Sequence, residues 1–407
     1  MTFIQKWSRL AVLNFLILAA AGVLLRYKIL FPLPWVDHKH LLHAHSHFAF
    51  AGWVSLALYI AIIHTLQPNE FQTKQFTRIL WMHQLSSFGM LLTFPFMGYA
   101  ALSIVFSTLS ILVSFWFAWI AWGMISTNTK LSFEKKWFYA ALVCNVVSAL
   151  GTFALAYLMM NKIMHQSWYF GSVYFYLHFQ YNGWFLFTIL GLLFVYAGKW
   201  MSITQVNISD RFFLLLMIAL VPAWFLSMLW MRVPEWMHYA GIAAAVLQLM
   251  AIWLFIRLMV QLKNNLQAAI HPMVKWLWSF SILAFLIKII LQAFSAVPEL
   301  NKYAFGIRPI VMGFLHLVLL GFVSIFILGY FVQNHLISVE RNVAKKGIWI
   351  FVTGVLLNEM ILMSQGIAAI RFTDIPYSNK LLLGCAVTIF TGLLLLLQPQ
   401  YQKRRGV

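Results

Sequence analysis

Three histidines in this chain begin the same short motif: each is followed five residues later by a glycine and an aromatic residue. The copies are His47 with Gly52-Trp53, His178 with Gly183-Trp184 and His316 with Gly321-Phe322. They are separated by 131 residues (178 − 47) and 138 residues (316 − 178). This even spacing predicts a threefold internal repeat with one histidine in each copy. Because neutral imidazole is a common nitrogen ligand of haem iron and copper, the histidines predict a haem or metal site.

The composition indicates which elements position these histidines. The chain has 407 residues, of which 63% are hydrophobic and only 9% charged, and its mean hydropathy is +0.84. An apolar segment of roughly 20 residues crosses a bilayer as a helix. Twelve such spans are predicted, at 8–31, 41–66, 76–98, 99–125, 136–160, 168–197, 211–231, 235–262, 271–292, 307–335, 346–367 and 380–399. We therefore expect an all-α polytopic membrane protein.

The twelve spans divide into three repeats of four helices, with boundaries near 1–130, 131–265 and 266–407. The whole chain then forms a single membrane domain. The three motif histidines fall on the second, sixth and tenth helices, about 10–15 Å below the same membrane surface. A packing role, in which histidines form interhelical hydrogen bonds beside glycines that permit close approach, is the alternative. Three symmetric ionisable groups inside a membrane favour the functional interpretation.

The distribution of Lys and Arg predicts the orientation. Eighteen basic residues lie on the side that holds the N-terminus, and ten lie on the opposite side. The positive-inside rule places both termini in the cytoplasm, with the protein in the inner, cytoplasmic membrane. The net charge of +19 is explained by basic residues that flank the spans and face lipid headgroups, and no motif supports nucleic-acid binding.

Further polar residues extend the candidate site. His43 and His47 share a helix face, whereas His45 faces a different neighbour. Glu359 is a carboxylate deep inside a span, where such a group usually serves protons or metals; the alternative is a protonated acid bonded through Asn358. Two arginines at the outer ends of spans are candidate partners of haem propionates, or are interface residues that extend to the headgroups; these are Arg308 and Arg371.

The segment His178-Phe-Gln-Tyr-Asn-Gly183-Trp resembles the helix-6 segment of the nitric oxide reductase large subunit. The run His45-Ser-His47-Phe-Ala-Phe-Ala-Gly52 resembles the His-x-His helix of the same family. The twelve-helix plan is similar to subunit I of the haem-copper oxidase superfamily, including the cbb3-type oxidases. A looser similarity connects His43-Ala44-His45 with the His-Ala-His of NnrS-type membrane haem proteins.

The resemblance implies one or two b-type haems, bound by histidines among His43, His45, His47, His178 and His316, and a second metal, copper or iron, at His47, His178 or His316. In one arrangement, a helix-2 histidine and His316 hold one haem, and His178 is left for the second metal. In the other, each role of the family is shifted by four helices, so that helix 2 carries the His-x-His of two haems, His178 is the second ligand of the low-spin haem and His316 binds the second metal. Tyr181, Asn182 and Glu359 are then the candidate catalytic residues. In the family a metal-binding glutamate stands where this chain has Asn182.

The helix expected at 211–231 lacks the His-His pair of the superfamily, so a normal copper site is incomplete. We therefore expect a redox or gas-linked haem protein, fed by cytochrome c or quinol, rather than an oxygen-reducing proton pump. A haem protein that senses or buffers nitric oxide without turnover is the alternative. A histidine-bearing transporter without haem is a third, weaker alternative.

Overall fold

The computed structural model describes residues 2–401, which are helical with no β-strand among them. The chain divides into two compact units. Unit 1 comprises Met1–Trp119 with Ile327–Val407, and unit 2 comprises Ile120–Phe326. Each unit is described by itself below.

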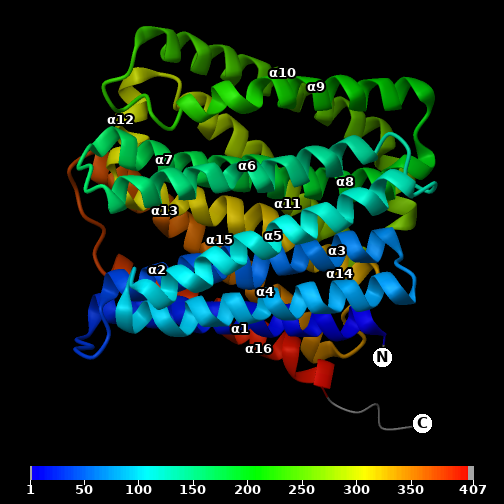
Figure 1. Cartoon of the computed structure of the whole chain (residues 1–407), viewed down its shortest axis with the longest axis horizontal. Helices are drawn as coiled ribbons and strands as arrows, with labels where there is room; N and C mark the ends of the chain where they lie inside the picture. Colours follow the sequence, from blue (N-terminus) through cyan, green and yellow to red (C-terminus); the bar gives the residue numbers. More distant parts are fainter. Residues whose placement is uncertain (1, 402–407) are drawn as a thin grey trace. The chain divides into compact units, whose positions relative to one another are not determined.

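Unit 1 brings together the first and last parts of the chain (Figure 1). In it α1 packs against α16, α15 packs against α16, and α2 packs against α4. Its helical segments, two of which continue past the unit boundaries, are α1 (Phe3–Leu30), α2 (His38–Phe48), η1 (Ala49–Ser55), α3 (Leu56–Leu66), α4 (Glu70–Met97), α5 (Ala101–Thr127), α14 (Ile325–Gln333), α15 (Asn342–Ile370) and α16 (Ser378–Tyr401).

Unit 2 contains the central part of the chain. The neighbouring helices α9 and α10 pack along each other, α6 packs against α7 and α8, and α10 packs against α11. Its segments are α6 (Lys135–Met160), α7 (Gln166–His178), η2 (Phe179–Phe185), α8 (Leu186–Ala197), η3 (Gly198–Trp200), α9 (Ile203–Phe225), α10 (Glu235–Ala269), α11 (Pro272–Phe294), α12 (Pro298–Gly306), α13 (Arg308–His316) and η4 (Leu317–Ser324).

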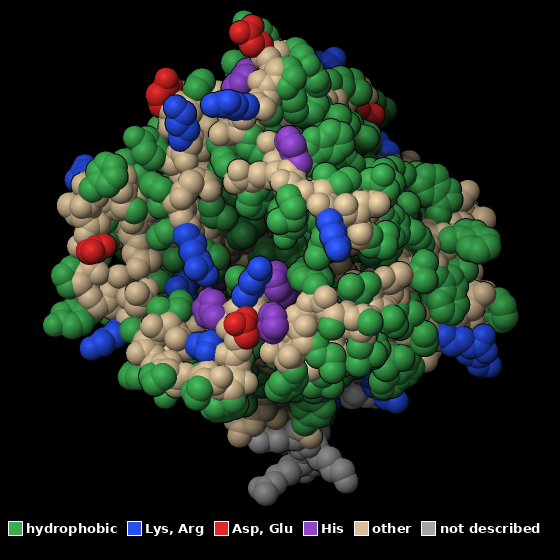
Figure 2. All heavy atoms as spheres, turned by 60° about the vertical axis from the view of Figure 1, so that its left-hand side comes forward, with side chains coloured by type: hydrophobic (Ala, Val, Ile, Leu, Met, Phe, Trp, Pro, Cys, Tyr) green, Lys and Arg blue, Asp and Glu red, His purple; other side chains and the backbone are tan. Residues whose placement is uncertain are grey.

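Eleven helices in the described part of the chain are long and apolar enough to cross a membrane, which confirms a polytopic membrane protein in outline. The remaining predicted span, 76–98, lies within α4. That helix is less apolar because polar residues also lie along its middle, including His83, Gln84, Ser86 and Ser87. Hydrophobic side chains also cover most of the face shown in Figure 2, as expected of helices that face lipid.

Most predicted helix boundaries lie within a few residues of the observed ones. The larger differences include 211–231, which the structure places at Ile203–Phe225, and 235–262, whose helix continues to Ala269. The first of these helices starts earlier because Ser202 and Gln205 form a capping box, in which each side chain accepts from the other residue's backbone N–H. Its end follows Pro222, which lacks the N–H of a regular helix turn. Helix α4 ends at Met97, and the following Gly98 adopts φ +58°.

The feature that the sequence did not predict is a π-helix after each motif histidine. Two of them, η2 and η4, begin directly after His178 and His316, and η1 begins two residues after His47. Each contains the motif glycine. The first helix of each predicted repeat packs on the corresponding π-helix: α1 on η1, α6 on η2 and α11 on η4. Since π-helices are rare and frequently lie at functional sites, three at equivalent places support the threefold repeat.

Candidate functional site

The π-helix η1 is held by buried polar side chains from two neighbouring helices. A π-helix pairs residues five apart, so some of its carbonyls are left for other donors. Asn14 donates to the Gly52 carbonyl at 2.7 Å and exchanges hydrogen bonds with Gln84 at 3.0 and 2.9 Å. His83 donates through Nε2 to the Ala51 carbonyl at 2.9 Å. His83 therefore has the structural role of satisfying a carbonyl of η1.

The other two π-helices have similar supports. Asn145 on α6 stands 131 residues after Asn14 (145 − 14), the separation of the first two motif histidines, and its Oδ1 accepts from Gln180 in η2 at 3.2 Å. At the third π-helix, Ser281 on α11 donates to the Phe322 carbonyl in η4 at 2.8 Å. Each π-helix is thus bonded to an earlier long helix: η1 to α1, η2 to α6 and η4 to α11.

Two of the α2 histidines share a face, as predicted. His47 stacks on Phe94, with ring centroids 4.6 Å apart, and its Nε2 is hydrogen-bonded to the Tyr99 hydroxyl at 3.0 Å. The His43 ring meets Tyr99 edge-on at 4.8 Å. These contacts hold both imidazoles at the α4–α5 turn. Figure 2 shows histidine side chains gathered near basic side chains and an acid on the face in view.

His45 faces the opposite side of α2, also as predicted. A Cβ added at Gly22 of α1 would lie 3.3 Å from the His45 ring, so α1 approaches this imidazole closely because Gly22 has no side chain. The start of α2 is fixed by Asp37, whose carboxylate accepts from the His40 backbone N–H at 2.8 Å. That hydrogen bond is the main reason that the pKa of Asp37 lies below its ordinary value.

His178 belongs to a directional chain of buried hydrogen bonds. Its Nε2 lies 2.7 Å from the Leu220 carbonyl, which only accepts, so Nε2 carries the proton. Nδ1 then accepts from the Asn182 amide nitrogen at 3.0 Å. The Asn182 oxygen in turn accepts from the ammonium group of Lys288 on α11. Both ring nitrogens of His178 are therefore engaged by the protein, which makes it the motif histidine least suited to ligate a metal in this arrangement.

His316 presents its ring differently. Its Nδ1 lies 2.7 Å from the Met312 carbonyl, so Nδ1 carries the proton and Nε2 has the lone pair. Histidines that bind metals commonly donate their other N–H to a carbonyl in this way. Tyr181 lies in the same unit, with its ring 6.1 Å from that of Phe314, two residues before His316. The structure thus places Tyr181 close to the helix of His316.

The remaining predicted site residues lie apart from the histidines of their own units or at the surface. Glu359 is half-buried on α15 and accepts at 3.1 Å from the amide of Asn358, the preceding residue on the same helix. Arg308 begins α13 and Arg371 follows the end of α15, and both are exposed. Both arginines therefore lie at helix ends, where a role at the membrane interface or toward propionates was expected.

Two observations bear on whether this arrangement fits a haem or a metal. Within residues 2–401, no group of three or more His, Cys, Asp or Glu side chains is placed to hold a metal ion. The space beside two of the motif glycines is filled by protein: a Cβ at Gly52 would meet the Phe48 ring at 2.5 Å, and one at Gly183 would meet Cys144 at 2.5 Å. These two glycines serve close packing rather than leaving room for a macrocycle.

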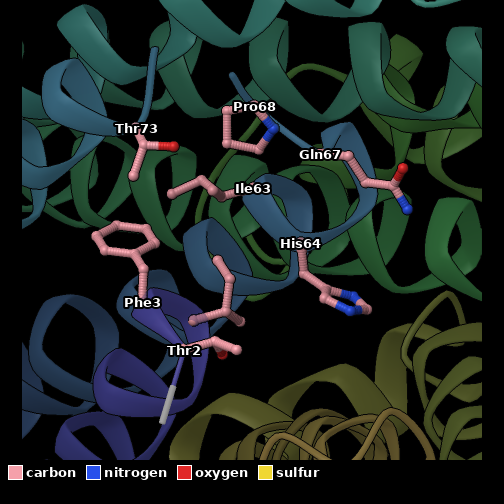
Figure 3. Close-up of a pocket in the computed structure, with 8 residues that line it drawn as sticks. Thr2, Phe3, Ile63, His64, Gln67, Pro68 and Thr73 are labelled. Carbon is pink, nitrogen blue, oxygen red and sulfur yellow. The ribbon is translucent and has the colours of Figure 1, made fainter. Parts of the chain in front are cut away.

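A cavity of about 240 Å³ lies elsewhere in unit 1, between the start of α1, the end of α3 and the start of α4 (Figure 3). Its polar lining includes His64, whose Nδ1 is hydrogen-bonded to the Tyr330 hydroxyl at 2.9 Å. Gln67 lies on the same side as His64, and Phe3 and Thr73 lie across from them. The cavity contains none of the predicted site residues.

Lys288 is the buried group that sequence reasoning missed. It is 1% exposed in the second half of α11. The signal was present in the sequence, because a lysine inside an apolar span is costly and usually functional. Its ammonium contacts the buried side-chain oxygen of Asn182.

We predict that Asn182→Leu destabilises the protein by about 3–5 kcal/mol, because it leaves the buried Lys288 ammonium and His178 Nδ1 without their common partner. Thermal unfolding of the detergent-purified protein measures the change. The matched double variant Asn182→Leu/Lys288→Met should recover most of the loss, since the uncompensated charge is gone. Equal instability of the single and double variants would contradict this account.

Comparison with known proteins adds no relative. No protein-family model matches the chain, and no curated protein matches it.

Proposed function

We propose that this chain is a membrane b-type haem protein, related in plan to the catalytic subunits of oxidases and nitric oxide reductases, with twelve transmembrane helices in three repeats. The observation that carries the proposal is the His316 imidazole, whose Nδ1 proton is donated to Met312 while Nε2 keeps the lone pair that iron requires. It stands at the start of one of three equivalent π-helices. A bound haem would supply reversible one-electron chemistry and gas binding.

The α2 histidines are the other proposed haem ligands. His45 lies close against Gly22 of α1, and His43 and His47 present their rings toward Tyr99. Arg308 and Arg371 are the proposed propionate partners, and Glu359 is a proposed proton-handling group. The electron donor is proposed to be cytochrome c or quinol.

A second candidate is a haem protein that binds nitric oxide without turnover. The double engagement of His178 favours it, because that histidine is then not available for a second metal. Purified protein expressed with added haem should show a Soret band and a pyridine haemochrome of b type. Adding nitric oxide under reducing conditions separates the candidates: consumption supports the first, and a stable spectral shift supports the second. Haem-free protein with no Soret band would refute both.

We also propose that both termini are cytoplasmic and that the motif histidines lie in the outer half of the inner membrane. Single cysteines that replace Ser132 and Trp168 test this orientation, because both positions are exposed. Ser132 lies just before α6, and Trp168 lies beyond the other end of α6, in the first turn of α7. The native Cys144 and Cys385 are buried and should give little background. We expect a membrane-impermeant maleimide to label position 168, but not position 132, in intact cells. The reverse pattern would overturn the orientation.

A further inference from the structure

The cavity in unit 1 lies where membrane helices begin or end (Figure 3). Its wall is formed by the first turn of α1, the last turn of α3 with the residues that follow it, and the first turn of α4. The ends of membrane helices lie near the membrane surface. Gln67 in the wall is exposed, so the cavity reaches the surface of the molecule. A molecule that dissolves in the membrane with its polar end at the surface can therefore enter it.

The size and the apolar part of the wall suit one small ring. The cavity has a volume of about 240 Å³. An apolar cavity of roughly 150 Å³ already holds a benzene molecule. The apolar lining consists of Phe3, Ile4, Ile63 and Pro68. The side chains of Phe3 and Pro68 are themselves rings, which favours a flat apolar body in contact with them.

Hydrogen bonds determine which ring nitrogen of His64 is left for a ligand. The Thr65 hydroxyl donates to the Ala61 carbonyl at 2.9 Å, so at its 3.2 Å contact with the Tyr330 hydroxyl it can only accept. Tyr330 thereby uses its single proton, and its 2.9 Å contact with His64 requires Nδ1 to donate. Donation from Tyr330 to the Ala61 carbonyl at 3.3 Å leads to the same tautomer. His64 Nε2 therefore carries the lone pair.

That lone pair is the acceptor which the cavity offers. His64 lines the cavity, whereas Tyr330, to which its Nδ1 edge is turned, does not. A ligand in the cavity thus meets the Nε2 edge and must bring a donor to it. A hydroxyl group suits this position. A cationic amine does not, because α1 and α4 both begin at the cavity and the N-terminal ends of helices disfavour positive charge.

We propose that this cavity binds a membrane-soluble aromatic alcohol, with its ring against Phe3, Ile63 and Pro68 and its hydroxyl donating to His64 Nε2. Tyr330 is a positioning residue, because it keeps the imidazole proton on Nδ1. The proposal concerns binding alone, and it holds whether or not the chain carries a haem.

The test compares two compounds that differ in the proposed donor. The first, para-hexylphenol, has the hydroxyl, and the second, para-hexylanisole, has a methyl ether in its place. We measure their binding to the detergent-purified protein by equilibrium dialysis, corrected for uptake by empty micelles. The wild type should bind the phenol about three- to tenfold more tightly than the anisole, the range expected of one hydrogen bond.

Variants of two histidines locate the acceptor. His64→Phe keeps a ring but removes the nitrogen, so it should bind both compounds equally. His335→Asn is the matched control, because it changes an exposed histidine of unit 1 outside the cavity to a residue that tolerates the positive φ at this position. It should keep the wild-type preference. Equal binding of the two compounds by the wild type, or a preference for the phenol that persists in His64→Phe, would overturn the proposal.

A further variant leaves the bond between His64 and Tyr330 intact and decides the matter if His64→Phe does not fold. Thr73 lines the cavity across from His64 (Figure 3). Thr73→Phe should fill the space that the ring occupies and abolish specific binding of the phenol. Unchanged affinity of Thr73→Phe for the phenol would show that the compound binds elsewhere.

Discussion

His316→Ala is expected to lower the haem bound per polypeptide by roughly tenfold or more. Mutating a residue that only supports a metal ligand already lowers metal affinity by about this factor, and removing the ligand itself should lower it at least as much. The physical reason is the tautomer seen in unit 2: the Met312 carbonyl holds the proton on Nδ1, so Nε2 is the basic nitrogen that iron would take. Pyridine haemochrome analysis against protein concentration measures the ratio. His45→Ala and His47→Ala test the α2 ligands in the same assay.

His178→Ala serves as the contrasting variant. Because both of its ring nitrogens are engaged by Leu220 and Asn182, we expect it to lower stability while the protein that remains folded keeps its haem. His165→Ala, at an exposed position before α7 where the side chain makes no capping hydrogen bond, is a control that should leave both properties unchanged. Full haem occupancy in His316→Ala, or selective loss in His178→Ala, would reverse the assignment.

The second large effect is expected at the contact of α15 with α16. A Cβ at Gly392 would collide with the backbone nitrogen of Phe351 and lie 2.7 Å from the Gly347 carbonyl oxygen. Backbone atoms cannot move aside as a flexible side chain can, so Gly392→Val should destabilise the protein by on the order of 3 kcal/mol or more. Thermal unfolding and the yield of monodisperse protein in detergent measure this loss.

The same helix supplies the control. Gly384 on α16 has no atom within 4 Å of its added Cβ, so Gly384→Val should change stability little. Comparable losses at both positions would show that the close helix contact at Gly392 does not control the result. Full stability of Gly392→Val would show that the two helices separate without cost.

The sequence by itself determined the elements of the fold. Hydropathy and length located the spans to within a few residues in most cases, because a membrane helix must be long and apolar whatever its neighbours are. It also determined which histidines share a face of α2, since that follows from helix geometry alone. The start of α9 was predicted too late because hydropathy alone does not detect the capping box at Ser202, although that local signal is present in the sequence.

The tertiary structure alone decided the state of each candidate side chain. The motif predicted three equivalent histidines, yet His178 is engaged at both nitrogens whereas His316 bonds its own helix through Nδ1. The π-helices and the link between Asn182 and Lys288 also depend on neighbouring helices. A hydrogen-bond partner from a distant part of the chain leaves no periodic pattern in the sequence. The motif could therefore locate these histidines, but only the packing of the helices shows which ring nitrogens are engaged.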